Sequence, residues 1–459
     1  MLMRVMICVF PVPAHLMPLV PFAWALQSAG HDVCVASPPG YPSGVAVPDF
    51  ARVVNAAGLT AVPCGEPAPL SIHDMAYPGY ADLLPTREES ESYVDALGIR
   101  DKKDRDAWDA FYHFALLTIR DYHPPEPRPD IGALVEFARS WEPDLVLWEP
   151  WFPAGAIAAG VAGAAHARIL ISPDSTAWAH ERCVAAGRTS LLAEAMRPLA
   201  ERYGLAVDDE LLFGDWTVDP NLPGLRLPTA VPTVPARFVP YTGAAVRQEW
   251  LDTPPERPRV AVSLGSSGRE FLKGDWGRTA KLMEAVADLD IEVVATLNAN
   301  QLEDVPDGVP ANVRVVEYVP LDQLLPSCAA TINHGSYGTF MASVAKRVPQ
   351  LICDTDEPAR LYGTATDAGI DWEFQCEKAQ YASTTSAYVT ECGAGVRLNH
   401  QVQSPSEIRE LLGAVLEETS YREGARSLHE EWLTLPSPAG IVPRLEELTA
   451  LHRAGKARN

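Results

Sequence analysis

The hydrophobic pattern of this chain alternates between two kinds of segment. Short, almost continuous apolar runs are bounded by turn residues, which is typical of strands buried on both faces of a parallel sheet. Between them lie segments such as residues 20–29, in which apolar residues recur at helical spacing. In the first half of the chain the apolar runs are residues 5–10, 33–37, 144–149 and 167–172. This alternation predicts a doubly wound α/β unit.

The pattern stops in a proline-rich passage, residues 220–258, and then restarts. The new apolar runs are residues 259–264, 291–297, 313–319, 329–333 and 350–354. We therefore predict an α/β protein with two doubly wound, Rossmann-like domains, residues 1–219 and 259–459, joined by the linker. Sheets of this kind bind ligands outside the carboxyl ends of their strands, so we expect the active site in a cleft between the two domains.

Three regions interrupt the alternation. Residues 68–130 predict a helical insertion in the first domain, and residues 360–392 predict a second insertion in the other domain. At the end of the chain, residues 436–451 predict a helix that can pack back across both domains.

The first insertion contains a concentrated aromatic stretch. A helix from about Lys103 would place Trp108, Phe111 and Tyr112 on one face, with Phe114 close by. We expect this stripe to be buried against the domain core, against an acceptor molecule or against a partner protein.

Composition and charge restrict the function class. The chain has 459 residues, of which 47% are hydrophobic, so it is long enough for two or three domains with cores of their own. Its net charge of -23 would repel nucleic acid and anionic membranes. The apolar start ends at Pro11 and Pro13 without a cleavage site, which favours a buried strand over a signal peptide, and no apolar window is long enough to span a membrane.

The cysteines show neither a disulfide framework nor a metal site. The eight cysteines are spread along the chain, with no Cys-x-x-Cys pair and no Cys/His cluster at zinc spacing. Several lie in apolar runs, where a thiol behaves as a small hydrophobic group. We expect a reducing, cytoplasmic setting.

A glycine-containing turn follows the apolar run 329–333. It comprises His334, Gly335, Ser336, Tyr337, Gly338 and Thr339 and leads into a helical pattern. The N–H groups at a helix N-terminus are unpaired and lie at the positive end of the helix dipole, so such a turn can hold a diphosphate. An ordinary strand-to-helix turn would show the same glycines.

The first predicted strand is followed by a histidine and not by a glycine-rich turn. Residues 11–15 contain no glycine, which makes the first domain a poor nucleotide binder, and they include His15. Glu149 follows the strand predicted at 144–149. If the two strands are neighbours, the carboxylate would fix the tautomer of His15 and stabilise its protonated form. A structural histidine and a glutamate that interacts with a helix dipole are the alternatives.

Two further clusters follow strands of the second domain. Ser266 and Ser267 could contact phosphate or a sugar oxygen, or lie in a flexible turn. Asp354 and Asp356 have the Asp-x-Asp spacing with which some transferases hold a divalent metal, but a hard cation needs more oxygen ligands than this stretch offers. We expect Asp356 and Glu357 to accept hydrogen bonds from sugar hydroxyl groups instead.

Taken together, these motifs resemble the GT-B glycosyltransferases that attach deoxysugars to bacterial polyketides, particularly macrolide and anthracycline aglycones. The resemblance covers nearly the whole chain in the expected order. Its motifs are residues 14–26, 143–150, 163–168, 238–241, 264–267, 318–320, 334–339, 393–395 and 438–443.

The resemblance implies an inverting transfer of a deoxysugar from a dTDP-sugar to a hydroxyl group of the aglycone, with the dTDP-sugar as co-substrate and no other cofactor. His15 takes the position of the family's general base, and Glu149 that of its supporting acid. By the same resemblance we expect the backbone at Val319 to contact the pyrimidine, residues 334–339 to hold the diphosphate, and residues 356–358 to face the sugar.

This chain departs from the family pattern at three places. Ser336 stands where the family has the second glycine of a His-Gly-Gly turn, and Glu357 stands where many relatives have glutamine or alanine. The segment from Asp356 to Gly393 is also longer, which suggests a lid, a partner surface or a tolerated loop.

The resemblance also implies a partner. Members of this family often work with an auxiliary protein of cytochrome-like fold, which contacts the insertion matching residues 68–130. The aromatic stretch from Trp108 to Phe114 fits such a contact or the wall of an acceptor pocket. Apart from the resemblance, a homodimer is a further assembly that the sequence leaves open.

Two other functions compete with the transferase. A sugar-nucleotide epimerase of the same fold would convert a dTDP-sugar without any aglycone. A non-catalytic scaffold or activator of a second transferase would keep the fold but would have no need of His15 and Glu149.

Overall fold

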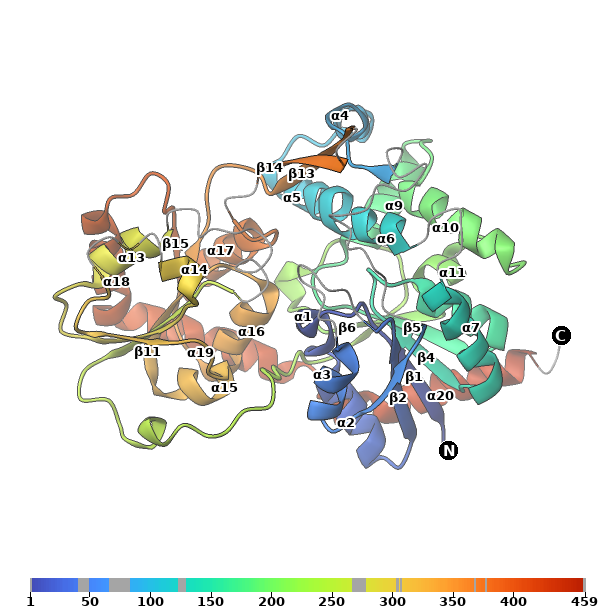
Figure 1. The fold of residues 1–459 in the computed structure, drawn as a ribbon, viewed down its shortest axis with the longest axis horizontal. Helices are drawn as coiled ribbons and strands as arrows, with labels where there is room; N and C mark the ends of the chain where they lie inside the picture. The colour runs from blue at the N-terminus through green and yellow to red at the C-terminus, as the bar shows by residue number, and fades with distance from the viewer. Residues whose placement is uncertain are drawn as a thin grey trace. The chain divides into compact units, whose positions relative to one another are not determined.

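The computed structural model describes residues 2–39, 49–65, 83–122, 129–265, 278–302, 305, 308–366, 369–375 and 378–456. The chain forms two compact units (Figure 1). Unit 1 consists of Met1–Phe238, Arg360–Phe374 and Leu435–Asn459, and unit 2 consists of Val239–Ala359 and Gln375–Thr434. Two segments of the range predicted for the second domain therefore belong to unit 1.

Unit 1 is built on a parallel sheet with the strand order β3-β2-β1-β4-β5-β6-β7. Its strands are β1 (Arg4–Cys8), β2 (Asp32–Ser37), β3 (Thr60–Pro63), β4 (Leu145–Trp148), β5 (Ala165–Ile169), β6 (Trp216–Asp219) and β7 (Thr233–Pro235). The apolar runs become central strands because their side chains are buried on both faces, as in β4 and β5. The predicted doubly wound sheet is confirmed.

Helices connect the strands of this sheet. They are α1 (Pro13–Leu16), α2 (Val20–Ser28), α3 (Phe50–Ala56), α7 (Pro129–Trp141), α8 (Ala154–Ala162), α9 (Ser175–Ala185), α10 (Leu191–Arg202) and α11 (Asp209–Phe213). Part of the predicted linker belongs to this unit as well, because β7 pairs with β6 in parallel. Proline is tolerated there because β7 is an edge strand.

The part of the predicted insertion 68–130 that the structure describes before residue 123 is helical from Arg87 onward, as expected, but its aromatic stretch changes helix type. It contains α4 (Arg87–Ala96), α5 (Lys102–Ala110), a π-helical turn η2 (Phe111–Ala115) and α6 (Leu116–Tyr122). Asp101 caps α5 by accepting a hydrogen bond from the backbone N–H of Asp104. Because the π turn adds a residue to the turn, the spacing of a regular α-helix does not hold through the stretch.

Three of the four aromatic residues lie in the hydrophobic core of unit 1. Trp108, Phe111 and Tyr112 are at most 1% exposed and belong to the same cluster as Trp148 of β4. The Trp108 and Tyr112 rings stack with centroids 5.6 Å apart. The prediction that this stripe covers a partner or an acceptor is therefore corrected: its side chains are already covered by the unit itself. Phe114 is half-buried.

A hairpin from the second predicted insertion also belongs to unit 1. It consists of β13 (Arg360–Thr366) and β14 (Gly369–Gln375). Arg360 pairs with the buried Asp109 of α5 at 2.9 Å, and His113 Nδ1 donates to the carbonyl oxygen of Leu361 at 2.8 Å. Burial lowers the pKa of His113 to about 3, so this imidazole is neutral when it donates. The predicted insertion 360–392 is thus not a single element.

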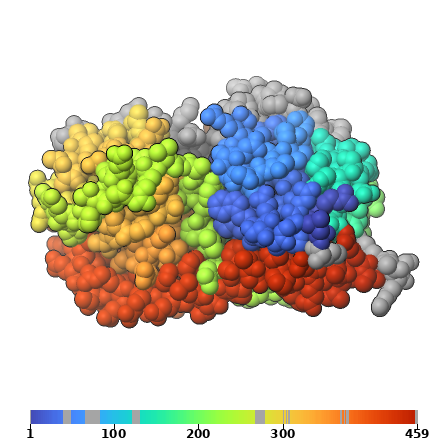
Figure 2. All heavy atoms as spheres, turned by 90° about the horizontal axis from the view of Figure 1, so that it is seen from below, coloured from blue at the N-terminus to red at the C-terminus, as the bar shows by residue number. Residues whose placement is uncertain are grey.

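The last helix, α20 (Pro438–Lys456), packs on α2 of unit 1. Figure 2 shows this C-terminal segment, in red, against the blue N-terminal elements of the unit. His452 Nδ1 lies 2.9 Å from a carboxylate oxygen of Asp215, and His31 pairs with Glu446 at 3.4 Å. The expected C-terminal helix is present, and it is part of unit 1.

Unit 2 repeats the architecture with the strand order β10-β9-β8-β11-β12-β15. Its strands are β8 (Arg259–Ser263), β9 (Glu292–Thr296), β10 (Val313–Val316), β11 (Cys328–Asn333), β12 (Gln350–Cys353) and β15 (Gly395–Leu398). Its helices are α13 (Arg278–Val286), α14 (Ala299–Leu302), α15 (Leu321–Leu324), α16 (Tyr337–Lys346), α17 (Ala382–Glu391), α18 (Pro405–Glu417) and α19 (Thr419–Thr434). All strand pairs of this sheet are parallel. Across the part of the chain that the structure describes, no helix is both long and apolar enough to cross a membrane.

Candidate active site

In both sheets the strand order reverses once, and the expected site residues follow the strands at that reversal. In unit 1 the reversal lies between β1 and β4, where Cys8 is in register with Trp148. The carboxyl ends of two strands diverge there into different connections, which leaves room for a ligand. His15 follows β1 and Glu149 follows β4.

The structure brings His15 and Glu149 together. His15 Nδ1 lies 3.2 Å from Glu149 Oε1, although the residues are 134 positions apart in the chain. His15 sits in the short helix α1, whose first residue, Pro13, needs no N–H partner at that position. The predicted pair therefore forms through the pairing of β1 with β4.

Both carboxylate oxygens of Glu149 accept hydrogen bonds. Its side chain is fully buried, and its two oxygens also accept backbone N–H groups from Phe10 at 3.2 Å and Trp151 at 2.9 Å. An ionised carboxylate can only accept, so Nδ1 of His15 carries the proton in this contact. The other ring nitrogen, Nε2, is then the basic atom of the imidazole.

Aromatic rings fix the orientation of His15. The Phe10 ring lies 5.3 Å and the Trp151 ring 4.8 Å from the imidazole, centroid to centroid. The His15 side chain is 12% exposed, so it is oriented by its neighbours yet reachable from solvent. A neutral imidazole held in one tautomer by a buried carboxylate can accept a proton from a hydroxyl group and remain stable as an imidazolium.

The glycine-containing turn lies at the reversal of the second sheet. It joins β11 to α16, and β11 pairs with β8 so that Asn333 is in register with Ser263. Gly335 has φ of +76°, a conformation that favours glycine, and its N–H donates to Asn333 Oδ1 at 2.9 Å. Ser336 is the N-cap residue of α16, but its hydroxyl donates to Thr339 Oγ1 at 3.2 Å and does not cap the backbone. The turn can therefore offer the N-terminus of α16 to an anion.

His334 is held between the ends of β8 and β11. Its Nδ1 lies 3.2 Å from the carbonyl oxygen of Ser263, and a Cβ added to Gly265 would lie 2.6 Å from its Nε2. Burial, with a smaller contribution from the charge of Arg278, lowers the pKa of His334 to about 4. The imidazole is thus neutral near pH 7, and the positive potential here comes from α16 and from the Arg278 guanidinium.

Arg278 was not among the predicted site residues. It is the first residue of α13 and is 3% exposed. A buried arginine at the start of a helix gives no distinctive pattern in one sequence, because surface arginines occupy the same positions.

The Asp-x-Asp stretch follows β12, the neighbour of β11. Asp354 is 3% exposed and accepts from Lys378 at 3.1 Å and from Arg397 at 2.8 Å, while Asp356 pairs with Arg397 at 2.6 Å. Two cationic side chains of the chain itself thus occupy the carboxylates that a metal would need. Within the described ranges, no group of three or more His, Cys, Asp or Glu side chains is arranged to hold a metal ion.

The remaining residues predicted to bind the dTDP-sugar lie at several places in unit 2. Val319 is buried beyond β10, and Tyr318 donates to the carbonyl oxygen of Thr242. Gly338 and Glu357 are exposed, and Thr339 is half-buried. Ser266 and Ser267 lie outside the described residues. Of the aromatic residues proposed for an acceptor or partner, Trp108, Phe111 and Tyr112 belong to the core described above, and Phe114 is half-buried.

Comparison with known proteins covers both units. Residues 24–265 match the family model described as Erythromycin biosynthesis protein CIII-like, N-terminal domain, and residues 280–448 match the corresponding C-terminal domain.

Similar proteins match over almost their entire length. The 10-deoxymethynolide desosaminyltransferase of Streptomyces venezuelae is 39% identical, covering 98% of each chain. The aclacinomycin-T 2-deoxy-L-fucose transferase of Streptomyces galilaeus is 37% identical, covering 98% of this chain and 97% of the relative. Among solved structures, the glycosyltransferase VinC in complex with dTDP matches with a TM-score of 0.71 and 29% identity, covering 98% of this chain and all of VinC.

Proposed function

The chain belongs to the Erythromycin biosynthesis protein CIII-like family, and from this premise we propose how it works: it transfers a deoxysugar from a dTDP-sugar to a hydroxyl group of a polyketide aglycone. It is a glycosyltransferase with the GT-B fold, like its relatives. The family's substrates are deoxysugars and macrolide or anthracycline aglycones, which favours this function over an epimerase or a scaffold.

The contact between His15 and Glu149 is the observation that carries the proposal. His15 Nε2 takes the proton from the hydroxyl group of the aglycone. At the same time the oxygen of that hydroxyl group attacks the anomeric carbon of the sugar. The bond from that carbon to the diphosphate breaks on the opposite face, so the configuration inverts and dTDP leaves with the bonding electrons. Glu149 stabilises the imidazolium that results.

The departing diphosphate gains negative charge, and the turn from His334 to Thr339 is suited to it. The N-terminus of α16, which has no side-chain cap, and the buried Arg278 favour an anion there. We assign the sugar to Asp356 and Glu357 and the pyrimidine to the backbone at Val319. All the residues to which we assign the diphosphate and the pyrimidine of the donor thus belong to unit 2.

A panel of dTDP-sugars tests the proposal directly. Thermal unfolding is measured with each sugar, and a ligand at 100 times its dissociation constant should stabilise the protein by about 2.7 kcal/mol. The sugar that stabilises most is then incubated with macrolide and anthracycline aglycones, and a glycosylated product is expected by mass spectrometry. A new dTDP-sugar isomer formed without any aglycone would support the epimerase instead. Donor binding without any product would support the scaffold.

Donor binding and turnover are expected to be independent of metal. Lys378 and Arg397 already neutralise the Asp354 carboxylate, and α16 supplies the potential that a cation would otherwise give the diphosphate. Full activity should therefore remain after exhaustive EDTA treatment. Activity that is lost and then restored by manganese or magnesium would instead return the Asp-x-Asp stretch to a metal site.

Glu149→Gln is expected to lower turnover by about tenfold, since an amide keeps the shape of the carboxylate but loses its charge next to the imidazolium. Donor affinity should not change. Exposed Glu201 lies in the same unit, so Glu201→Gln is the matched control and should have wild-type turnover. Equal turnover of the two variants would remove Glu149 from the mechanism.

We also propose the setting and the partner. The described cysteines are free thiols, which supports a reducing, cytoplasmic compartment. An auxiliary protein would contact the exposed side chains of the insertion, such as those of Glu88 and Lys103, because the aromatic stripe is buried. Raised turnover on adding the auxiliary protein supports this contact, and unchanged turnover contradicts it.

A further inference from the structure

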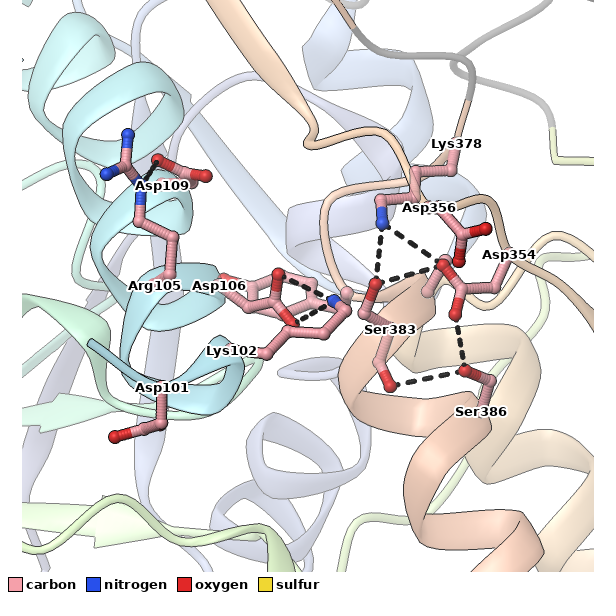
Figure 3. Close-up of polar contacts among 12 residues, drawn as sticks. Asp101, Lys102, Arg105, Asp106, Asp109, Asp354, Asp356, Lys378, Ser383 and Ser386 are labelled. Atoms are coloured by element: carbon pink, nitrogen blue, oxygen red, sulfur yellow. Dashed lines mark hydrogen bonds and ion pairs between the residues drawn. The ribbon is translucent and has the colours of Figure 1, made fainter. Parts of the chain in front are cut away.

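A buried lysine connects the end of β12 with α17. Lys378 is 3% exposed, and its ammonium group donates to Asp354 Oδ1 at 3.1 Å, to the carbonyl oxygen of Thr355 at 2.8 Å and to Ser383 Oγ at 2.6 Å. Figure 3 shows Lys378, Ser383 and Ser386 converging on Asp354. The three N–H groups of the ammonium are thus used, which compensates for its removal from water.

Asp354 is surrounded on its other side as well. Its second oxygen, Oδ2, accepts from Ser386 Oγ at 2.9 Å and from Arg397 Nε at 2.8 Å. With Lys378 and Ser383 on Oδ1, four donors meet the two oxygens. A carboxylate of this kind is rigid, because any rotation would break a hydrogen bond to a buried charged group.

The same helix, α17, also supports the diphosphate turn. Thr385 Oγ1 donates to the carbonyl oxygen of Gly335 at 3.0 Å, and a Cβ added to Gly335 would lie 2.6 Å from the Cα of Ala382. The turn after β11 and the stretch after β12 therefore rest on one face of one helix.

The fixed carboxylate positions a second, exposed one. Arg397 bridges Asp354 to Asp356 Oδ1, and Asn399 Nδ2 lies 3.3 Å from Asp356 Oδ2. The Asp356 side chain is 76% exposed, and a carboxylate has about four acceptor sites, so it can still accept hydrogen bonds from a ligand.

We propose that Lys378 is a positioning residue for the donor sugar: as a cation built into the chain, it sets the Asp354–Glu357 stretch at a fixed distance from the diphosphate turn. This inference rests on the proposed function, because it assigns the sugar to Asp356 and Glu357. Lys378 lies in the segment by which this chain is longer than the family pattern, so the added segment contributes to the donor site.

Lys378→Met tests the inference, because methionine keeps the length of the side chain and removes its charge. Titration calorimetry is carried out with dTDP and with the dTDP-sugar that stabilises the wild-type protein most in the panel. The affinity for the dTDP-sugar should fall about tenfold or more, the effect of losing a hydrogen bond to a charged group, whereas the affinity for dTDP should change less than about twofold.

Lys346→Met is the matched control. Lys346 lies in the same unit, in the last turn of α16, at the opposite end of that helix from the diphosphate turn. Its two affinities should stay at wild-type values. If Lys378→Met does not fold, the double variant Lys378→Met/Asp354→Asn removes both charges of the pair, and it should fold and show the same selective loss.

The outcomes separate this inference from the proposed function. A wild-type protein that binds neither dTDP nor any dTDP-sugar overturns both. A wild-type protein that gains affinity from the sugar, together with Lys378 variants that keep that gain, overturns the role of Lys378 alone. An equal loss for dTDP and dTDP-sugar would show that Lys378 supports the fold of unit 2 and not the sugar site.

Discussion

His15→Ala is expected to lower turnover at least about a hundredfold, because a positioned general base contributes on the order of a hundred- to ten-thousand-fold to the rate. The hydroxyl group of the acceptor is a weak nucleophile until its proton is removed, and alanine leaves no group at that position to accept it. The affinity for dTDP should remain unchanged, since the dTDP-binding residues assigned above belong to unit 2.

His452→Ala is the control for this experiment. His452 is also held by a carboxylate, that of Asp215 at 2.9 Å, but Asp215 precedes β6 and thus lies at the amino end of the sheet. Ligands bind at the opposite, carboxyl edge. Single-turnover rates and dTDP affinity are measured for both variants. Near wild-type turnover of His15→Ala would show that His15 is not the base.

Phe111→Ala is expected to lower the free energy of unfolding by roughly 3–5 kcal/mol, since it removes a fully buried ring from a packed core. Phe111 lies in the π turn, and its ring centroid is 5.7 Å from that of Trp108. The substitution would leave a cavity lined by apolar side chains, which water does not fill favourably. Thermal or urea unfolding of the purified protein measures the loss.

The half-buried Phe114 offers a matched comparison within the same turn. Phe114→Ala should cost clearly less stability, because less of its surface is removed from water. The acceptor Michaelis constant of the folded fraction of Phe111→Ala should stay normal. Wild-type stability with a raised acceptor Michaelis constant would assign the ring to the acceptor, and a loss of activation by an auxiliary protein would assign it to the partner.

Part of the candidate site could be predicted because a buried strand can be recognised from a short stretch of sequence. An apolar run of the length of β1 or β4 can be recognised from neighbouring residues alone, and the segment that follows each run starts at the carboxyl edge of a parallel sheet. His15 and Glu149 were found in this way. That they touch depends on the pairing of β1 with β4, which connects residues far apart in the chain.

The aromatic stretch shows where local reasoning stops. Helical spacing correctly predicted that Trp108, Phe111 and Tyr112 would need cover, because large apolar rings are costly in water. Periodicity does not say what covers them. Only packing showed that unit 1 does so itself, through the same core that contains Trp148.

What the sequence determined by itself is therefore the set of local features: two series of parallel strands, the turns that follow them, and the chemical groups at the strand ends. Only the tertiary structure decided which distant groups meet. Lys378 neutralises Asp354, and the hairpin that begins at Arg360 joins unit 1 through Asp109. Both contacts arise because a buried charge must find a partner, and the partner is set by the folded chain rather than by its neighbours in sequence.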